Sequence, residues 1–158
     1  MTDHVDKVLA QWARERPDLD ASPMAVVGRL SRVARRFTEE MAETFSAHGL
    51  DAAAFDVLAT LRRSGSPFTL SPTDLTADSM VTSSAVAQRL NRLEAQGLVR
   101  RSPSPEDGRG KQVTLTAEGR RVVDAALPAH IATEHRLLAG LSGKERETLA
   151  TLLAKLDS

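Results

Sequence analysis

The sequence predicts a mainly α-helical fold that contains one small β-hairpin. Apolar residues recur at helical spacing along most of the chain, which is typical of amphipathic helices. Ser, Thr or Asp residues, which favour helix starts, precede most of these segments. Only two short stretches, 98–102 and 111–116, have strand character, and the segment between them is rich in turn-forming residues.

The first half of the chain contains three predicted helices. Residues 3–16 form a short amphipathic helix whose apolar stripe includes Trp12. Ser22 and Pro23 mark the start of a second helix, with a capping hydroxyl followed by proline, and this helix runs to Gly49. Asp51 caps the third helix, which ends near Gly65.

The second half continues with a short helix that begins at Ser71 and another that Thr82 caps and Gly97 ends. The hairpin follows. Residues 117–141 form a long helix in which we expect Pro128 to cause a kink or a break, because proline removes a backbone donor. Ser142 caps the last helix.

The three helices that directly precede the hairpin, which start after Asp51, Ser71 and Thr82, form with it the element order of a winged helix-turn-helix. The terminal helices are too apolar to stand alone, so we expect them to form the interface of a homodimer. The predicted division is 1–48 for the extra N-terminal helix and first dimerisation helix, 49–119 for the DNA-binding domain, and 120–158 for the C-terminal dimerisation helices.

Composition narrows the class of protein. The chain has 158 residues, no cysteine and a net charge of zero, so disulfides and thiolate metal sites are excluded. No apolar run approaches the roughly 20 residues of a membrane span, and the N-terminus lacks the apolar stretch of a signal peptide. We therefore expect a cytoplasmic protein without a cofactor or a membrane partner. Residues 82–111 carry six basic and three acidic residues, a local positive excess that suits DNA.

The helix that follows Thr82 has the two faces of a recognition helix. Val86, Leu90 and Leu93 point toward the core, whereas the opposite face is small and polar. Side-chain amides on that face can read base edges in the major groove of double-stranded DNA. An ordinary solvated face is the alternative interpretation, but such faces usually carry Glu and Lys, which this one lacks. The predicted contacts of this helix are Ser83, Ser84, Ala87, Gln88, Asn91 and Arg92.

The tip of the hairpin is the second DNA-binding candidate. Arg109 can enter a narrow minor groove, and Asp107 can orient its guanidinium. Lys111 follows at the start of the second strand. A basic loop without a binding role is the alternative interpretation.

The stretches SSAVAQRLNRLEAQGLVRR (83–101) and EDGRGKQVTLTAEG (106–119) make the chain resemble the MarR family of transcriptional regulators over nearly its whole length. The resemblance implies a dimeric, DNA-binding repressor in which Asp107 and Arg109 belong to the DNA-contacting wing. Gly110 departs from the family pattern and should loosen the wing tip.

The segment AQWARERPDLDASPM (10–24) is similar to the urate-responsive branch of that family. The resemblance implies an effector site made by Trp12, Asp56, Arg63 and Arg89 for a small aromatic anion, urate or a related purine. Arginine forks suit planar anions and an indole suits stacking. Phenolic or other aromatic acids are the alternative effectors. In the free protein we expect Arg89 to pair with an acidic residue, with Asp56 as the candidate.

Two other classes are disfavoured. Motifs for a serine nucleophile or for phosphate binding are missing, and the four histidines lack the spacing of metal ligands, so we do not expect an enzyme. A purely structural helical protein would leave the Gln and Asn residues of the recognition face and the basic wing without a role.

Overall fold

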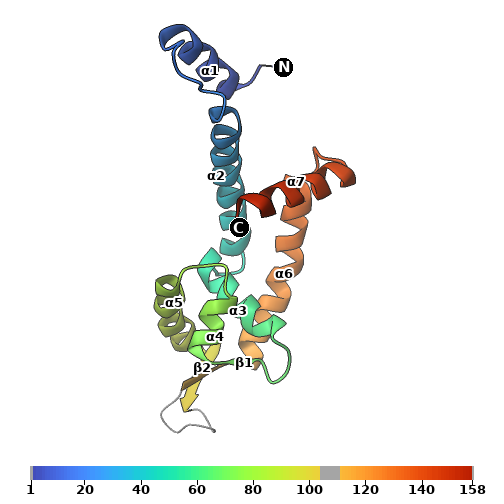
Figure 1. Ribbon diagram of the computed structural model, residues 1–158. Helices are drawn as coiled ribbons and strands as arrows, with labels where there is room; N and C mark the ends of the chain where they lie inside the picture. The colour runs from blue at the N-terminus through green and yellow to red at the C-terminus, as the bar shows by residue number, and fades with distance from the viewer. Residues whose placement is uncertain (1, 104–110, 158) are drawn as a thin grey trace. The chain divides into compact units, whose positions relative to one another are not determined.

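The computed structural model describes residues 2–103 and 111–157 (Figure 1). These residues form helices joined by short loops, together with a small antiparallel sheet, which confirms the predicted fold class. They divide into two compact units, residues 1–40 and 41–158. The elements are α1 (His4–Glu15), α2 (Met24–Ser46), α3 (Ala52–Arg63), β1 (Thr69–Leu70), α4 (Pro72–Asp78), α5 (Ser83–Ala95), β2 (Val99–Pro103), β3 (Lys111–Leu115), α6 (Ala117–Leu137) and α7 (Gly143–Leu156). None of the helices in the described ranges is long and apolar enough to cross a membrane.

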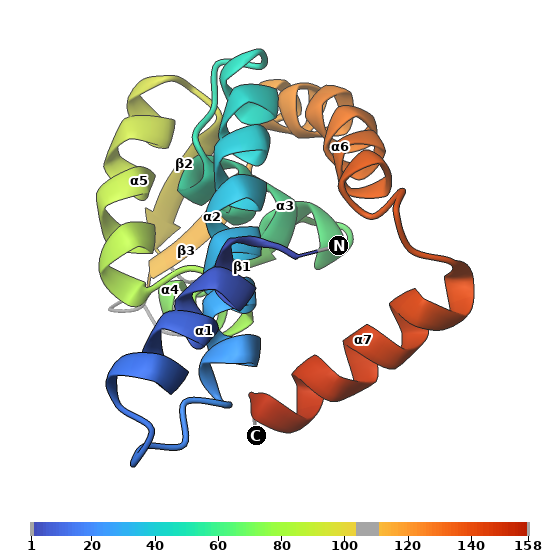
Figure 2. The ribbon, with the colours of Figure 1, turned by 90° about the horizontal axis from the view of Figure 1, so that it is seen from above.

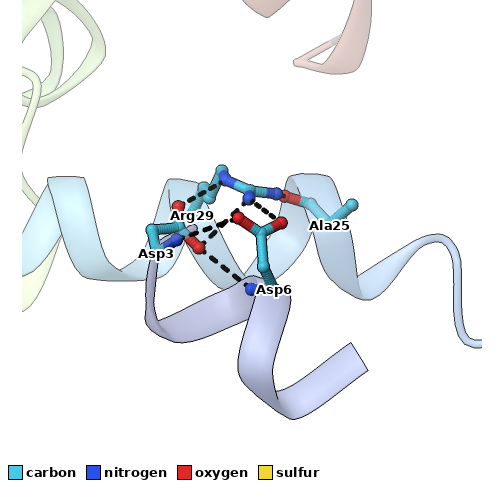
Figure 3. A network of polar contacts seen from close by, with 4 residues as sticks. All are labelled: Asp3, Asp6, Ala25 and Arg29. Carbon is cyan, nitrogen blue, oxygen red and sulfur yellow. Dashed lines mark hydrogen bonds and ion pairs between the residues drawn. The ribbon is translucent and has the colours of Figure 1, made fainter. Parts of the chain in front are cut away.

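The first unit holds α1 against the N-terminal part of α2 through a charged network (Figure 3). Asp3 caps α1, and its carboxylate accepts the Asp6 N–H at 2.9 Å while the Asp6 carboxylate accepts the Asp3 N–H. Arg29 of α2 reaches both acids, with Nε 2.8 Å from Asp3 and Nη2 2.6 Å from Asp6, and its Nη1 donates to the carbonyl of Ala25. Val5, the buried apolar residue of α1, packs over Gly28 beside this network.

In the second unit, α3 lies between α5 and α6, as Figures 1 and 2 both show. Val57, Leu58 and Leu61 on α3 are fully buried, together with Leu75 of α4 and Val113 of β3. Apolar burial of this kind is the main stabilising contribution to a fold. The core of this unit is therefore built around one helix.

Aromatic rings close one end of this core. The ring of Phe45, at the end of α2, stacks on Phe55 with 4.6 Å between centroids. The ring of His130, on α6, lies 4.7 Å from Phe55. At the other end of α3, the guanidinium groups of Arg62 and Arg120 lie over the Phe68 ring, 5.2 and 5.1 Å from its centroid. These contacts attach both ends of α3 to neighbouring elements.

The predicted helix starts are confirmed where a side chain caps the helix. Asp51, Ser71, Thr82 and Ser142 each accept the backbone N–H three residues later. The helix after Pro23 begins at Met24, with the preceding turn bonded from Ala25 N–H to the carbonyl of Ser22 at 2.9 Å. Local capping chemistry therefore determines where these helices begin.

The predicted hairpin is confirmed, and the sheet also contains a strand that the sequence did not reveal. β2 and β3 pair in antiparallel register from Val99 opposite Leu115 to Pro103 opposite Lys111. β1 adds to the free edge of β3, so that the strand order is β1-β3-β2. Two residues are too few to show the alternation that identifies a strand; pairing with β3 makes this segment a strand.

The predicted break at Pro128 is wrong, because α6 is one continuous helix that contains it, whereas a kink there stays a prediction. Pro128 lies on the exposed face of α6. The carbonyl of Asp124 loses its helical partner there, but at an exposed position it can be hydrated. The cost of the missing hydrogen bond is thus reduced.

We predict that Gly119→Ala destabilises the second unit. A Cβ at Gly119 would lie 2.0 Å from the Leu98 carbonyl oxygen. That oxygen accepts from both the N–H and the hydroxyl of Thr116, so it cannot move aside freely. The expected loss is about 1–3 kcal/mol or more in urea unfolding. Gly140→Ala is the matched control, since its Cβ would meet nothing within 4 Å; equal stability of the two variants would contradict the close approach.

We predict that acid loosens α1 in the first unit. The hydrogen bond from the Asp6 N–H, and then the Arg29 guanidinium, lower the pKa of the Asp3 carboxyl. A carboxylate with a lowered pKa stabilises the fold above its ordinary value of 3.8, and this contribution is lost as the pH falls through the lower folded value. Acrylamide quenching of Trp12, on α1, should therefore increase below pH 3.8.

Arg29→Met should show the same increased quenching at neutral pH and a weaker response to acid. Arg32→Met removes a guanidinium from the same helix without touching Asp3 or Asp6 and serves as the control. If Arg29→Met behaves like Arg32→Met at every pH, the network does not hold α1.

Candidate nucleic-acid interface and effector residues

The two faces of α5 are those that the sequence predicts. Val86, Leu90 and Leu93 are buried against the core of the second unit. The predicted recognition residues are all exposed: Ser83, Ser84, Ala87, Gln88, Asn91 and Arg92. This outer face contains no acidic side chain, so it can approach a polyanion without direct repulsion. Contact of these residues with DNA stays a prediction.

The structure describes the base of the wing, which consists of β2 and the paired strand β3. Lys111 is exposed at the start of β3, opposite Pro103. Asp107 and Arg109 lie outside the described residues. Exposed Arg100 is on β2, so Arg100 and Lys111 give the base of the hairpin a positive surface.

Arg101, one of the six basic residues between 82 and 111, is paired with an acidic side chain. Its guanidinium contacts Glu94 of α5, with Nη2 2.6 Å from Oε2, and its backbone N–H donates to the same carboxylate at 2.9 Å. These bonds lower the pKa of Glu94. Arg101 therefore attaches the hairpin to the recognition helix, and its charge is matched by Glu94. Glu94 is already one of the three acidic residues counted between 82 and 111, so the pairing leaves the local positive excess unchanged.

Asp56 contacts the segment that joins α4 to α5, and Arg63 contacts the end of α4. The Asp56 carboxylate accepts the N–H of Met80 at 2.8 Å and the N–H of Val81 at 3.2 Å. Arg63 donates to the carbonyl of Asp78, at the end of α4. Each of these two side chains of α3 therefore bonds to the helix-turn-helix.

Arg89 pairs with Asp51, so the expected partner, Asp56, is wrong. Arg89 Nε lies 3.0 Å from Asp51 Oδ1 and 2.9 Å from Oδ2. Asp51 stands at the N-cap of α3, where it faces the middle of α5, whereas the carboxylate of Asp56 is occupied by the turn. Partial burial acts to raise the pKa of Asp51, but the Ala54 N–H and the Arg89 guanidinium outweigh it and the pKa is lowered.

Sequence reasoning identified Asp51 only as a helix cap. A capping Asp uses one oxygen for the backbone, and its second oxygen remains available for a cation. The second carboxylate oxygen of Asp51 is therefore the feature of the sequence from which its pairing with Arg89 could have been predicted.

Trp12 lies in the first unit, and 42% of it is exposed. It lines a shallow cavity of about 220 Å³ together with Arg16, Leu19 and Met24. The guanidinium of Arg16 is paired with Asp18 at 2.6 Å, so this cavity offers an apolar indole edge more than a positive charge. Asp56, Arg63 and Arg89 belong to the second unit. Their joint action with Trp12 on one effector stays a prediction.

Comparisons with known proteins agree with this arrangement. A sequence profile of the MarR family matches residues 48–110. The transcriptional regulator PecS of Dickeya dadantii is 38% identical over 153 residues, which are 97% of this chain and 92% of PecS.

Solved structures agree as well. BpsR of Bordetella bronchiseptica, whose DNA binding is regulated by 6-hydroxynicotinic acid, matches with a TM-score of 0.76 and 30% identity over 84% of this chain and 93% of its own. A mutant of MarR from Escherichia coli in complex with operator DNA matches with a TM-score of 0.74 and 28% identity, over 87% of this chain and 99% of its own. These relatives regulate transcription and are not enzymes, as expected here. Since the chain spans almost the whole of PecS at this identity and carries the family profile over its helix-turn-helix, it belongs to the MarR family of transcriptional regulators.

Proposed function

We propose that the protein is a homodimeric repressor that binds a pseudo-palindromic operator and releases it on binding a small aromatic anion. The observation that carries the proposal is the outer face of α5, which is exposed, polar and free of acidic residues over the described helix. Such a repressor acts in the cytoplasm, where bacterial DNA lies.

Specificity would come from the amides of Gln88 and Asn91. An amide can donate to and accept from the edge of adenine in the major groove, which gives a bidentate contact. Arg92, Arg100 and Lys111 are exposed around this face and would neutralise phosphates. Arg109 would add a contact in the minor groove.

Dimerisation would use the apolar helices that remain uncovered in the single chain. Leu149, Leu152, Leu153 and Leu156 on α7 are exposed, as are Val26, Val27, Leu30 and Val33 on α2. Apolar side chains in such rows are typical of an interface. A two-fold dimer would place two copies of α5 about 34 Å apart, one turn of DNA.

The effector would be urate or a related purine. Arg63 and Arg89 offer guanidinium groups to its anionic edge, and Trp12 offers a flat apolar surface for its rings. An aromatic acid is the second candidate, favoured by the likeness to BpsR, whose regulator is 6-hydroxynicotinic acid.

Substitutions on α5 and on the wing should affect DNA binding differently. Gln88→Ala or Asn91→Ala should relax sequence preference by about 1–3 kcal/mol per lost base contact. Arg109→Ala should weaken binding to all sequences and reduce its salt dependence. Fluorescence anisotropy with operator and scrambled duplexes, at two salt concentrations, separates these effects. If all three variants bind both duplexes like the wild type, α5 and the wing do not read DNA.

Trp12 should report the effector, because it is the only Trp and the chain has no Tyr. Urate should quench its emission saturably, after correction for the absorbance of urate, and should release DNA over the same concentration range. Arg63→Ala should weaken urate binding about tenfold or more, the value of a charge-assisted hydrogen bond. Release by 6-hydroxynicotinic acid and not by urate would move the protein to the second effector class.

A further inference from the structure

Polar contacts tie α3 to the helix-turn-helix at three positions along its length. Asp51, before its first residue, contacts Arg89 in the middle of α5. Asp56 contacts the turn, and Arg63, the last residue of α3, contacts the end of α4; both reach the backbone of residues 78–81. All three contacts join segments that are 15 or more residues apart in the sequence.

The contact of Asp56 determines the path of the turn. One carboxylate oxygen, Oδ2, accepts both N–H groups, from Met80 and Val81. These residues lie outside α4 and α5, so their N–H groups have no partner within a helix. Thr82, the cap of α5, follows directly. Asp56 therefore holds the turn directly before the N-cap of the recognition helix.

The contact of Asp51 acts further along α5. Asp51 Oδ1 caps α3 by accepting the Ala54 N–H at 2.9 Å, and both its oxygens lie within 3.0 Å of Arg89 Nε. The Arg89 side chain is 31% exposed, so the pair is partly shielded from water. Apolar packing is non-directional, whereas an ion pair of this geometry opposes rotation of α5 about its own axis.

We propose that Asp51 and Asp56 are positioning residues in the ligand-free protein: Asp56 holds the turn before the recognition helix, and Asp51 sets the rotation of that helix. This inference rests on the proposed function, because the position of α5 matters only if α5 reads DNA. It also explains how an anion would act. An anion that binds Arg89 competes with Asp51, and one that binds Arg63 competes with the carbonyl of Asp78. Effector binding and the position of α5 are thus coupled through the same side chains.

Amide hydrogen exchange tests the role of Asp56 without DNA or effector. Asp56→Ala removes the acceptor, so exchange at the N–H groups of Met80 and Val81 should accelerate at least tenfold. Asp56→Asn removes the same charge but keeps an acceptor oxygen, and its rates should stay near those of the wild type. The buried amides of Leu58 and Leu61 report whether α3 stays folded. Equal rates in the two variants at Met80 and Val81 would overturn the role of Asp56.

A double-mutant cycle tests Asp51. Asp51→Ser retains a capping hydroxyl but is too short to reach Arg89, and Arg89→Gln removes the charge of its partner. Each variant should weaken operator binding in the absence of effector. The operator affinity of the double variant should be no lower than that of the single variant with the lower affinity, because both substitutions break the same ion pair. Additive losses would show that the two residues act independently.

The effector response separates a positioning role from a merely structural one. Asp51→Ser frees Arg89 for an anion, so urate should quench Trp12 at a severalfold lower concentration than in the wild type. A structural defect alone would leave this concentration unchanged or raise it, which would count against the proposal. If the wild-type protein binds no DNA, the proposed function is contradicted. The exchange rates at Met80 and Val81 would still test whether Asp56 holds the turn.

Discussion

The position of α3 in the core is the constraint on which the second unit depends. Its apolar face, with Val57, Leu58 and Leu61, is fully buried between α5 and α6. The same helix carries Asp56, which bonds to the turn before α5, and Arg63, which bonds to the end of α4. One helix therefore contributes both to the core and to the contacts that hold the recognition helix.

Because the net charge of the chain is zero, the effect of its charged residues depends on where they lie in the structure. Arg89 and Arg101 are matched by Asp51 and Glu94, and both pairs involve α5. They stabilise the position of the helix, whereas Arg92 on its outer face is exposed. Basic residues that are close together in the sequence thus differ in their surroundings. Arg89 and Arg101 hold α5 in place through ion pairs, whereas Arg92 is exposed and available to phosphate groups.

Local chemistry made much of the fold predictable. The side-chain caps at Asp51, Ser71, Thr82 and Ser142 lie three residues from the N–H groups they accept, so the sequence contains all of the information. The faces of α5 follow from helical periodicity. β1 was missed because two residues carry no period, and the continuity of α6 was missed because the cost of Pro128 depends on whether its position is exposed.

For the candidate site, the sequence by itself determined which residues are available: an exposed polar face on α5, a basic hairpin, and acidic and arginine residues at helical spacing on α3. Only the tertiary structure decided how they pair. Arg89 meets Asp51 and not Asp56, and Asp56 meets a backbone turn 24 residues later. The physical reason is that these partners lie on different elements. Their distances depend on how α3 packs against α5, which is set by the shape of the shared core and not by any local pattern.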